Sequence, residues 1–180
     1  MKAKIKIIIG CLLTALLTTS TYGCKEKTGN NNSTADADTA TVVKPVGPKF
    51  NADSAYAFIA AQCNFGPRTM NSTAHEQCGK WIVAKFKQYG CEVIEQKADL
   101  KGYDGTILKS TNIIARYNPK AKKRIMLCAH WDSRPWADND PDSTNHKKPV
   151  MAANDGASGV AVMLELARQL QADKKLEIGV

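Results

Sequence analysis

The sequence predicts an α/β fold, a three-layer sandwich in which helices cover a mixed central β-sheet. Two observations lead to this prediction. Helical and strand-like hydrophobic patterns alternate from Phe50 onwards, and one strand-like run, Ile125 to Ala129, is apolar at every position, as expected of a central strand buried on both faces. The 180 residues, of which 43% are hydrophobic and 23% charged, are typical of a globular chain with one domain.

Residues 1–23 are predicted to be a lipoprotein signal peptide. Three lysines precede an apolar core from Ile7 to Leu17, which is too short for a spanning helix, and the segment ends in Gly23-Cys24. This junction resembles the cleavage point of bacterial lipoproteins, where the cysteine is acylated and several acyl chains give stable anchoring. We therefore expect an extracytoplasmic chain, anchored through Cys24 to the periplasmic or surface side of a bacterial outer membrane. Thr21 stands three residues before Cys24, where bacterial lipoproteins usually have leucine, so a simple secreted protein is the alternative.

Residues 24–49 are predicted to be a flexible tether, because they are poor in large apolar side chains and rich in Asn, Ser, Thr, Ala and Asp. The folded domain then occupies residues 50–180. The formal net charge is +8, but three of the positive charges are the lysines of the signal. There is no arginine-rich stripe with interleaved aromatic residues, so we expect no nucleic-acid partner.

Helices are predicted in three segments, which are 53–65, 73–89 and 156–171, from apolar residues at helical spacing. Thr73 and Glu76 suggest a capping box at the start of the second helix, and Gly90 suggests its end. In the third helix an apolar face lies opposite a set of polar side chains. These polar side chains are Glu165, Arg168 and Gln169.

Strands are predicted in four segments, which are 91–96, 111–117, 124–129 and 174–180. Four cysteines lie in the folded part, and none has a spacing typical of a metal site, which argues against zinc held by sulfur. Cys128 lies in the apolar run 125–129, where a buried free thiol is expected. His75 and His146 have no partners at a ligand spacing, so we expect them in solvent.

Two clusters at predicted strand and helix ends carry side chains suited to chemistry. His130 and Asp132 flank one residue, so in an extended segment both side chains point to the same side. The alternative is a structural histidine that is hydrogen-bonded to Asp132. Asp155 lies in a loop that opens the third helix, where a helix N-cap is the alternative to a metal ligand.

Together the clusters resemble the zinc aminopeptidase and glutaminyl cyclase superfamily over residues 50–180. The shared pattern is His-Trp-Asp-Ser after an apolar strand, a long loop, and Ala-Asn-Asp-Gly-Ala-Ser-Gly-Val at a helix start. The resemblance implies a phosphorylase/hydrolase-like sandwich and a zinc cofactor. In the peptidases it implies that His130 binds one zinc and that Asp155 bridges two, while Asp132 serves catalysis by orienting His130 through the other ring nitrogen.

The amino-acid sequences of three segments resemble those of glutaminyl cyclases of the Bacteroidetes type. These segments are 130–138 (His-Trp-Asp-Ser-Arg-Pro-Trp-Ala-Asp), 140–142 (Asp-Pro-Asp) and 65–68 (Phe-Gly-Pro-Arg). The resemblance implies a single zinc with Asp155 as ligand. It also implies cyclisation of N-terminal glutamine in peptides and proteins to pyroglutamate, with release of ammonia.

In that family the general base and the remaining ligands come after the position of Val180. Because catalytic zinc needs three protein ligands and an open position, we expect these 180 residues to be inactive alone. Two alternatives remain, which are a zinc aminopeptidase and a non-catalytic binding lipoprotein on the same fold. Metal count separates the cyclase from the aminopeptidase, since hydrolysis generally uses a second zinc to prepare a water.

Overall fold

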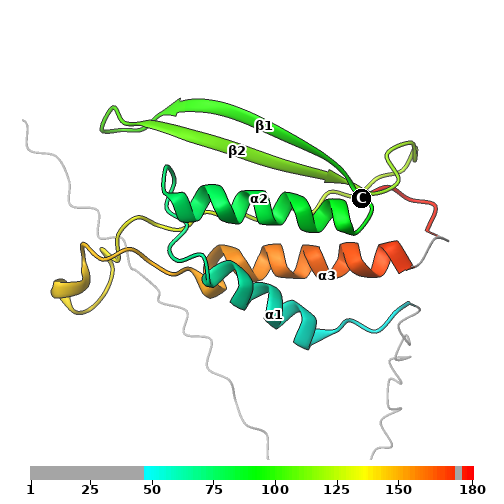
Figure 1. Ribbon diagram of the computed structural model, residues 1–180, viewed down its shortest axis with the longest axis horizontal. Helices are drawn as coiled ribbons and strands as arrows, with labels where there is room; N and C mark the ends of the chain where they lie inside the picture. The colour runs from blue at the N-terminus through cyan, green and yellow to red at the C-terminus, as the bar shows by residue number, and fades with distance from the viewer. Residues whose placement is uncertain (1–46, 173–175) are drawn as a thin grey trace, which may run out of the picture. The chain divides into compact units, whose positions relative to one another are not determined.

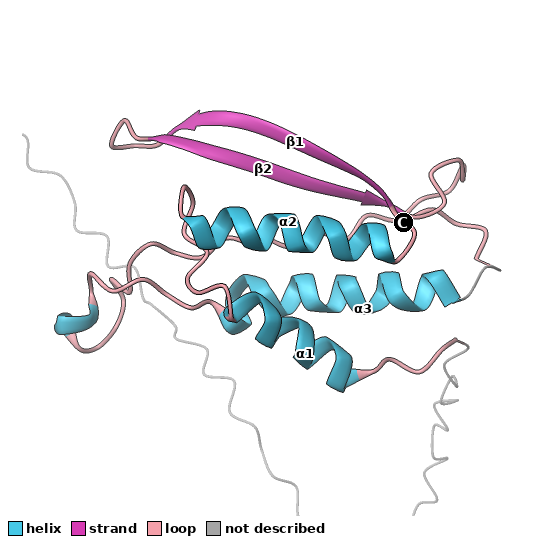
Figure 2. Cartoon of the chain, viewed as in Figure 1, coloured by secondary structure: helices cyan, strands magenta, loops and turns pink. Residues whose placement is uncertain are grey.

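The computed structural model describes residues 47–172 and 176–180, which form three helices and an antiparallel hairpin (Figure 1, Figure 2). In chain order the elements are α1 (Ala52–Cys63), α2 (Thr73–Gln88), β1 (Glu92–Lys101), β2 (Ile107–Arg116), the short η1 (Ser143–Asn145), the wide π-type turn η2 (Ala153–Ala157) and α3 (Ser158–Ala172). The predicted signal peptide, and the predicted tether up to residue 46, lie outside the described residues. Within the described ranges no helix combines the length and apolarity needed to cross a membrane.

The boundaries of α2 show how local signals place a helix. Ser72 is its N-cap, since the Ser72 side chain accepts a hydrogen bond from a backbone N–H of the first turn. The predicted capping box was therefore wrong by one residue: Thr73 already lies in the helix, and Glu76 pairs with Lys80 at 2.7 Å. Gly90 has φ +76° and follows the end of the helix, as predicted.

The hairpin lies over α2, and α3 lies on the other side of α2, next to α1 (Figure 1). β1 and β2 pair from Glu92 opposite Arg116 to Lys101 opposite Ile107. The hydrophobic core joins α2 to α3 through buried side chains. These are Cys78, Ile82, Phe86 and Tyr89 of the α2 region and Val160, Leu164 and Ala167 of α3. The three predicted helices and the α/β class are confirmed.

The prediction of a strand over residues 124–129 was wrong for the described structure. This segment is extended but carries a single parallel bridge, between Arg124 and Gly179. A strand needs a ladder of partners, and the described residues supply one at Arg124 alone. Met126 is consequently 85% exposed, and Cys128 is exposed rather than buried as expected. The segment lines a mainly apolar cavity of about 680 Å³ together with β2 and α3, and His130, Trp131 and Asp132 line it as well.

The polar face of α3 is largely covered rather than open to solvent. Glu165 is fully buried and Gln169 is 9% exposed, because the segment that enters α1 covers them. The Glu165 carboxylate accepts hydrogen bonds from Asn51 N (3.0 Å) and from Arg168, and Gln169 Nε2 donates to the carbonyl of Lys49 (3.0 Å). The paired Arg168 guanidinium holds the pKa of Glu165 well down, at about 2. The polar residues of α3 thus anchor the start of the domain.

Candidate functional site

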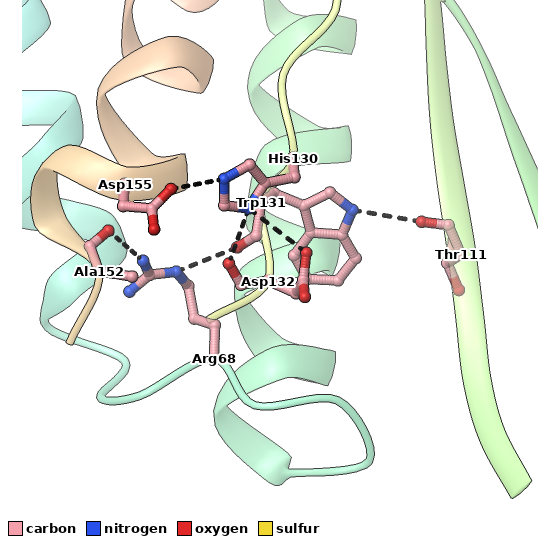
Figure 3. Close-up of polar contacts among 7 residues, drawn as sticks. All are labelled: Arg68, Thr111, His130, Trp131, Asp132, Ala152 and Asp155. Carbon is pink, nitrogen blue, oxygen red and sulfur yellow. Dashed lines mark hydrogen bonds and ion pairs between the residues drawn. The ribbon is translucent and has the colours of Figure 1, made fainter. Parts of the chain in front are cut away.

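The two predicted clusters meet at the N-terminal end of α3 (Figure 3). His130 Nε2 lies 2.9 Å from Asp155 Oδ1. The histidine comes from the extended segment after residue 124, and the aspartate comes from η2, 25 residues later in the chain. Both side chains remain accessible, with the His130 side chain 55% exposed and that of Asp155 84% exposed. The structure therefore places an imidazole and a carboxylate side by side at the surface.

Asp132 lies on the other side of the His130 ring. His130 Nδ1 is 3.2 Å from the backbone carbonyl oxygen of Asp132 and 3.5 Å from its Oδ1. Partial burial lowers the pKa of His130, but the hydrogen bond to Asp155 and the interactions with Asp132 outweigh it, so the pKa lies above its usual value. With Nδ1 facing Asp132, the neutral ring presents Nε2 towards Asp155. This is the arrangement that we predicted for an orienting Asp132, although its role stays a prediction.

The backbone of η2 aims Asp155 at His130. Asp155 and Gly156 have non-helical angles, and Gly156 has φ +102°. A Cβ atom at Gly156 would lie 3.0 Å from His130 Cε1 and 3.2 Å from the Asp132 carbonyl oxygen. Glycine is thus required both for the angle and for the close approach. The Asp155 carboxylate contacts His130, which favours the ligand hypothesis over the N-cap alternative.

Trp131 packs beneath the site. Its ring stacks on His75 with centroids 3.9 Å apart, and its Nε1 donates to the Thr111 carbonyl (3.2 Å). A Cβ at Gly79 would come within 2.9 Å of the indole, so the glycine makes room for the stack. The expectation of a solvated His75 was wrong: it is 6% exposed, and burial lowers its pKa. A histidine under a tryptophan gives no sequence spacing that would reveal it.

Arg68 is a residue of the site that the sequence did not predict. It is fully buried, and its guanidinium donates to the carbonyls of Trp131 (Nε, 3.2 Å) and Ala152 (Nη2, 2.8 Å) (Figure 3). A buried arginine is rare without partners. The sequence feature that could have indicated a role for Arg68 is its place in the Phe-Gly-Pro-Arg segment, which resembles that of glutaminyl cyclases.

The donor set suits zinc in part. Imidazole nitrogen and carboxylate oxygen are common zinc ligands, and in His130 the second ring nitrogen is held by a neighbouring group, as metal-bound histidines generally require. No third His, Cys, Asp or Glu completes a metal-binding group in the part of the chain that the structure describes. His130 and Asp155 could supply two ligands of a zinc site, and their role as ligands stays a prediction.

Several known proteins are similar to this chain. Residues 112–180 match the model of peptidase family M28. A solved glutaminyl cyclase of Bacteroides thetaiotaomicron, bound to N-acetylhistamine, is 50% identical with a TM-score of 0.72 over 74% of this chain and 46% of that chain. A leucine aminopeptidase precursor of the same species is also 50% identical, with a TM-score of 0.72 over 74% of this chain and 47% of that one. A Zn-dependent exopeptidase of Parabacteroides distasonis is 47% identical, with a TM-score of 0.71 over 74% and 46%.

These comparisons confirm the resemblance to Bacteroidetes glutaminyl cyclases within the zinc aminopeptidase superfamily. They also bear out the prediction of zinc, since the exopeptidase is named for it. The chain spans less than half the length of the three solved relatives.

Proposed function

We propose that the protein is a zinc-assisted glutaminyl-peptide cyclotransferase, which converts the N-terminal glutamine of peptides and proteins to pyroglutamate and releases ammonia. The observation that carries the proposal is the 50% identity to a solved glutaminyl cyclase over three quarters of this chain. The segments 65–68, 130–138 and 140–142 of the sequence point to the same activity.

The reaction is an intramolecular acyl transfer. The α-amine nitrogen attacks the γ-carboxamide carbon of the same residue, a new C–N bond closes the ring, and the carboxamide nitrogen leaves as ammonia with a proton from the amine. Bound zinc would polarise the carboxamide carbonyl and stabilise the negative charge that develops on its oxygen. The nucleophile is part of the substrate, so no water has to be activated.

The described residues have distinct parts in this reaction. Asp155 would hold the metal, because its carboxylate is more exposed than the His130 ring and its backbone is fixed by η2. Asp132 would orient the His130 ring from the Nδ1 side. His130 would lie beside the metal ligand and limit the positions that Asp155 can adopt.

A zinc aminopeptidase is the second candidate, because the leucine aminopeptidase precursor is as similar to this chain as the cyclase is. In that case both His130 and Asp155 would be metal ligands, with Asp155 shared between two zinc ions. The 2.9 Å approach of the two side chains is compatible with either arrangement.

The wider setting is part of the same proposal. Acylation of Cys24 would anchor the protein outside the cytoplasm of a bacterial cell, with peptides carrying N-terminal glutamine as its partners. The complete protein would form a three-layer sandwich in which a mixed sheet includes the extended segment 124–129.

The test uses protein expressed from the whole natural coding sequence. Asp155→Ala should lose bound zinc and pyroglutamate formation together, whereas His130→Ala should keep much of the metal if the protein is a cyclase. Asp104→Ala, which removes an exposed carboxylate in the turn between β1 and β2, is the matched control and should change neither. Zinc per chain is measured by mass spectrometry, alongside ammonia release from Gln-peptides and amino-acid release from Leu-peptides. Two results together would establish the peptidase instead: release of leucine, and two bound zinc ions in wild type with one of them lost in His130→Ala.

A further inference from the structure

We propose that Arg68 is a positioning residue that fixes the distance between the two halves of the candidate metal site, which are the His130–Asp132 segment and the turn that carries Asp155. The inference rests on the proposed zinc site, and it goes beyond that site by naming the group that assembles it. Arg68 touches neither proposed ligand, so it would act through the backbone that carries them.

The contacts of Arg68 bracket the site. Its Nε donates to the Trp131 carbonyl (3.2 Å), and its own carbonyl accepts from Ser133 N (3.0 Å). These two hydrogen bonds hold the chain on both sides of Asp132. Its Nη2 donates to the carbonyl of Ala152 (2.8 Å), three residues before Asp155. One side chain therefore binds both halves.

The remaining donors tie the guanidinium to the end of α1. Nη1 lies 3.4 Å from the carbonyl oxygens of both Gln62 and Gly66. All of these partners of the Arg68 guanidinium are backbone carbonyls. A buried cation is costly unless its donors are satisfied, so the carbonyl oxygens compensate the charge. A planar fork with five donors can join several segments at once, whereas a lysine has a compact head with three donors and cannot span them.

The exposed side chains of the two proposed ligands do not themselves fix this distance. The side chains of His130 and Asp155 are 55% and 84% exposed, so packing does not hold them in place. Ala152 has φ +53°, a left-handed angle that is unfavourable for alanine, and its carbonyl accepts from both Arg68 and Ala157 N. The surrounding structure must maintain such an angle. Arg68 supplies the shorter of these two hydrogen bonds.

The experiment compares Arg68→Met and Arg68→Lys with wild type, each expressed from the whole natural coding sequence. Zinc affinity is measured by competition with a chelator, and stability by urea unfolding. Both variants should bind zinc at least about tenfold more weakly, the range seen when groups supporting metal ligands are removed. Glu165→Gln is the control, because Glu165 is equally buried but anchors the start of α1 to α3. It should lower stability and leave zinc affinity unchanged.

Two further readouts separate positioning from general stability. In Arg68→Ala, guanidinium ion far below denaturing concentration should restore part of the zinc affinity, and methylammonium should not. In metal-free protein, the amides of Ser133 and Ala157 should exchange with solvent faster in Arg68→Met than in Glu165→Gln, because their hydrogen bonds belong to the two halves of the site.

The inference is overturned if Arg68→Met binds zinc as tightly as wild type, or if its loss of affinity matches that of a stability-matched Glu165→Gln. Unchanged exchange at Ser133 and Ala157 would also overturn it. A wild-type protein without zinc would refute the proposed function instead, and the exchange measurement would still decide the role of Arg68.

Discussion

Replacement of Gly156 by alanine tests the geometry of the site most directly. Gly156 follows Asp155 in the turn that presents this carboxylate to His130, and it has φ +102°. A methyl group at this position would lie 3.0 Å from His130 Cε1, 3.2 Å from His130 Nδ1 and 3.2 Å from the Asp132 carbonyl oxygen. The substitution therefore strains the backbone and pushes the imidazole away from Asp155.

Two contributions set the size of the effect. The positive φ angle costs an alanine about 1–2 kcal/mol, and an extra methyl group in a filled space costs about 1–3 kcal/mol. Gly90 provides the matched control, since it has φ +76° but no atom within 4 Å of an added Cβ. Gly90→Ala should therefore show the first contribution without the second.

Urea unfolding should show Gly156→Ala to be destabilised by about 2–5 kcal/mol and Gly90→Ala by about 1–2 kcal/mol, which are the sums of these contributions. Zinc affinity should fall in Gly156→Ala alone, because the contact with His130 exists only there. If the two variants lost equal stability and both retained zinc, the close approach of Gly156 to His130 would be refuted.

Two more predictions concern regions away from the site. The pKa of Glu165 is lowered to about 2 by Arg168 and its other donors, so its contribution to stability is present above the unfolded pKa of 4.5 and is lost as the pH falls from there towards 2. This contribution to the free energy of unfolding is about 3 kcal/mol at most. It should vanish from the pH dependence of urea unfolding in Glu165→Gln and persist in Glu76→Gln, whose replaced side chain is exposed. Equal pH profiles for wild type and Glu165→Gln would contradict the prediction. For the membrane anchor, labelled fatty acid should enter wild-type protein but not Cys24→Ser, and equal labelling of the two would exclude lipidation at this cysteine.

Sequence patterns predicted the helices well because helix signals are local. The apolar spacing and the caps around Ser72 and Gly90 lie within one or two turns of the helix that they define. The predicted strand at 124–129 failed for the opposite reason, since a strand depends on partners elsewhere in the chain. The burial of Glu165 also depends on a distant segment, whose Asn51 amide reaches it from 114 residues away.

The candidate site was predictable where it depended on neighbouring residues. His130 and Asp132 are two positions apart, and the turn of Asp155 opens a helix that was itself predicted. Arg68 was not predictable as a site residue because the partners of its guanidinium are backbone carbonyls, which any sequence provides. The burial of His75 was not predictable because its stacking on Trp131 depends on how α2 packs against the loop that carries Trp131, which no pattern in the sequence specifies.

The hydrogen bonds that secure the start of α1 affect the order in which the domain can assemble. Asn51 bonds to Glu165 and Lys49 bonds to Gln169, across 114 and 120 residues. During synthesis these contacts cannot close until residue 169 has emerged, so the start of α1 waits for α3. Contacts of such long sequence separation slow folding. The start of α1 therefore stays without these two anchors while the segment between it and α3 is being made.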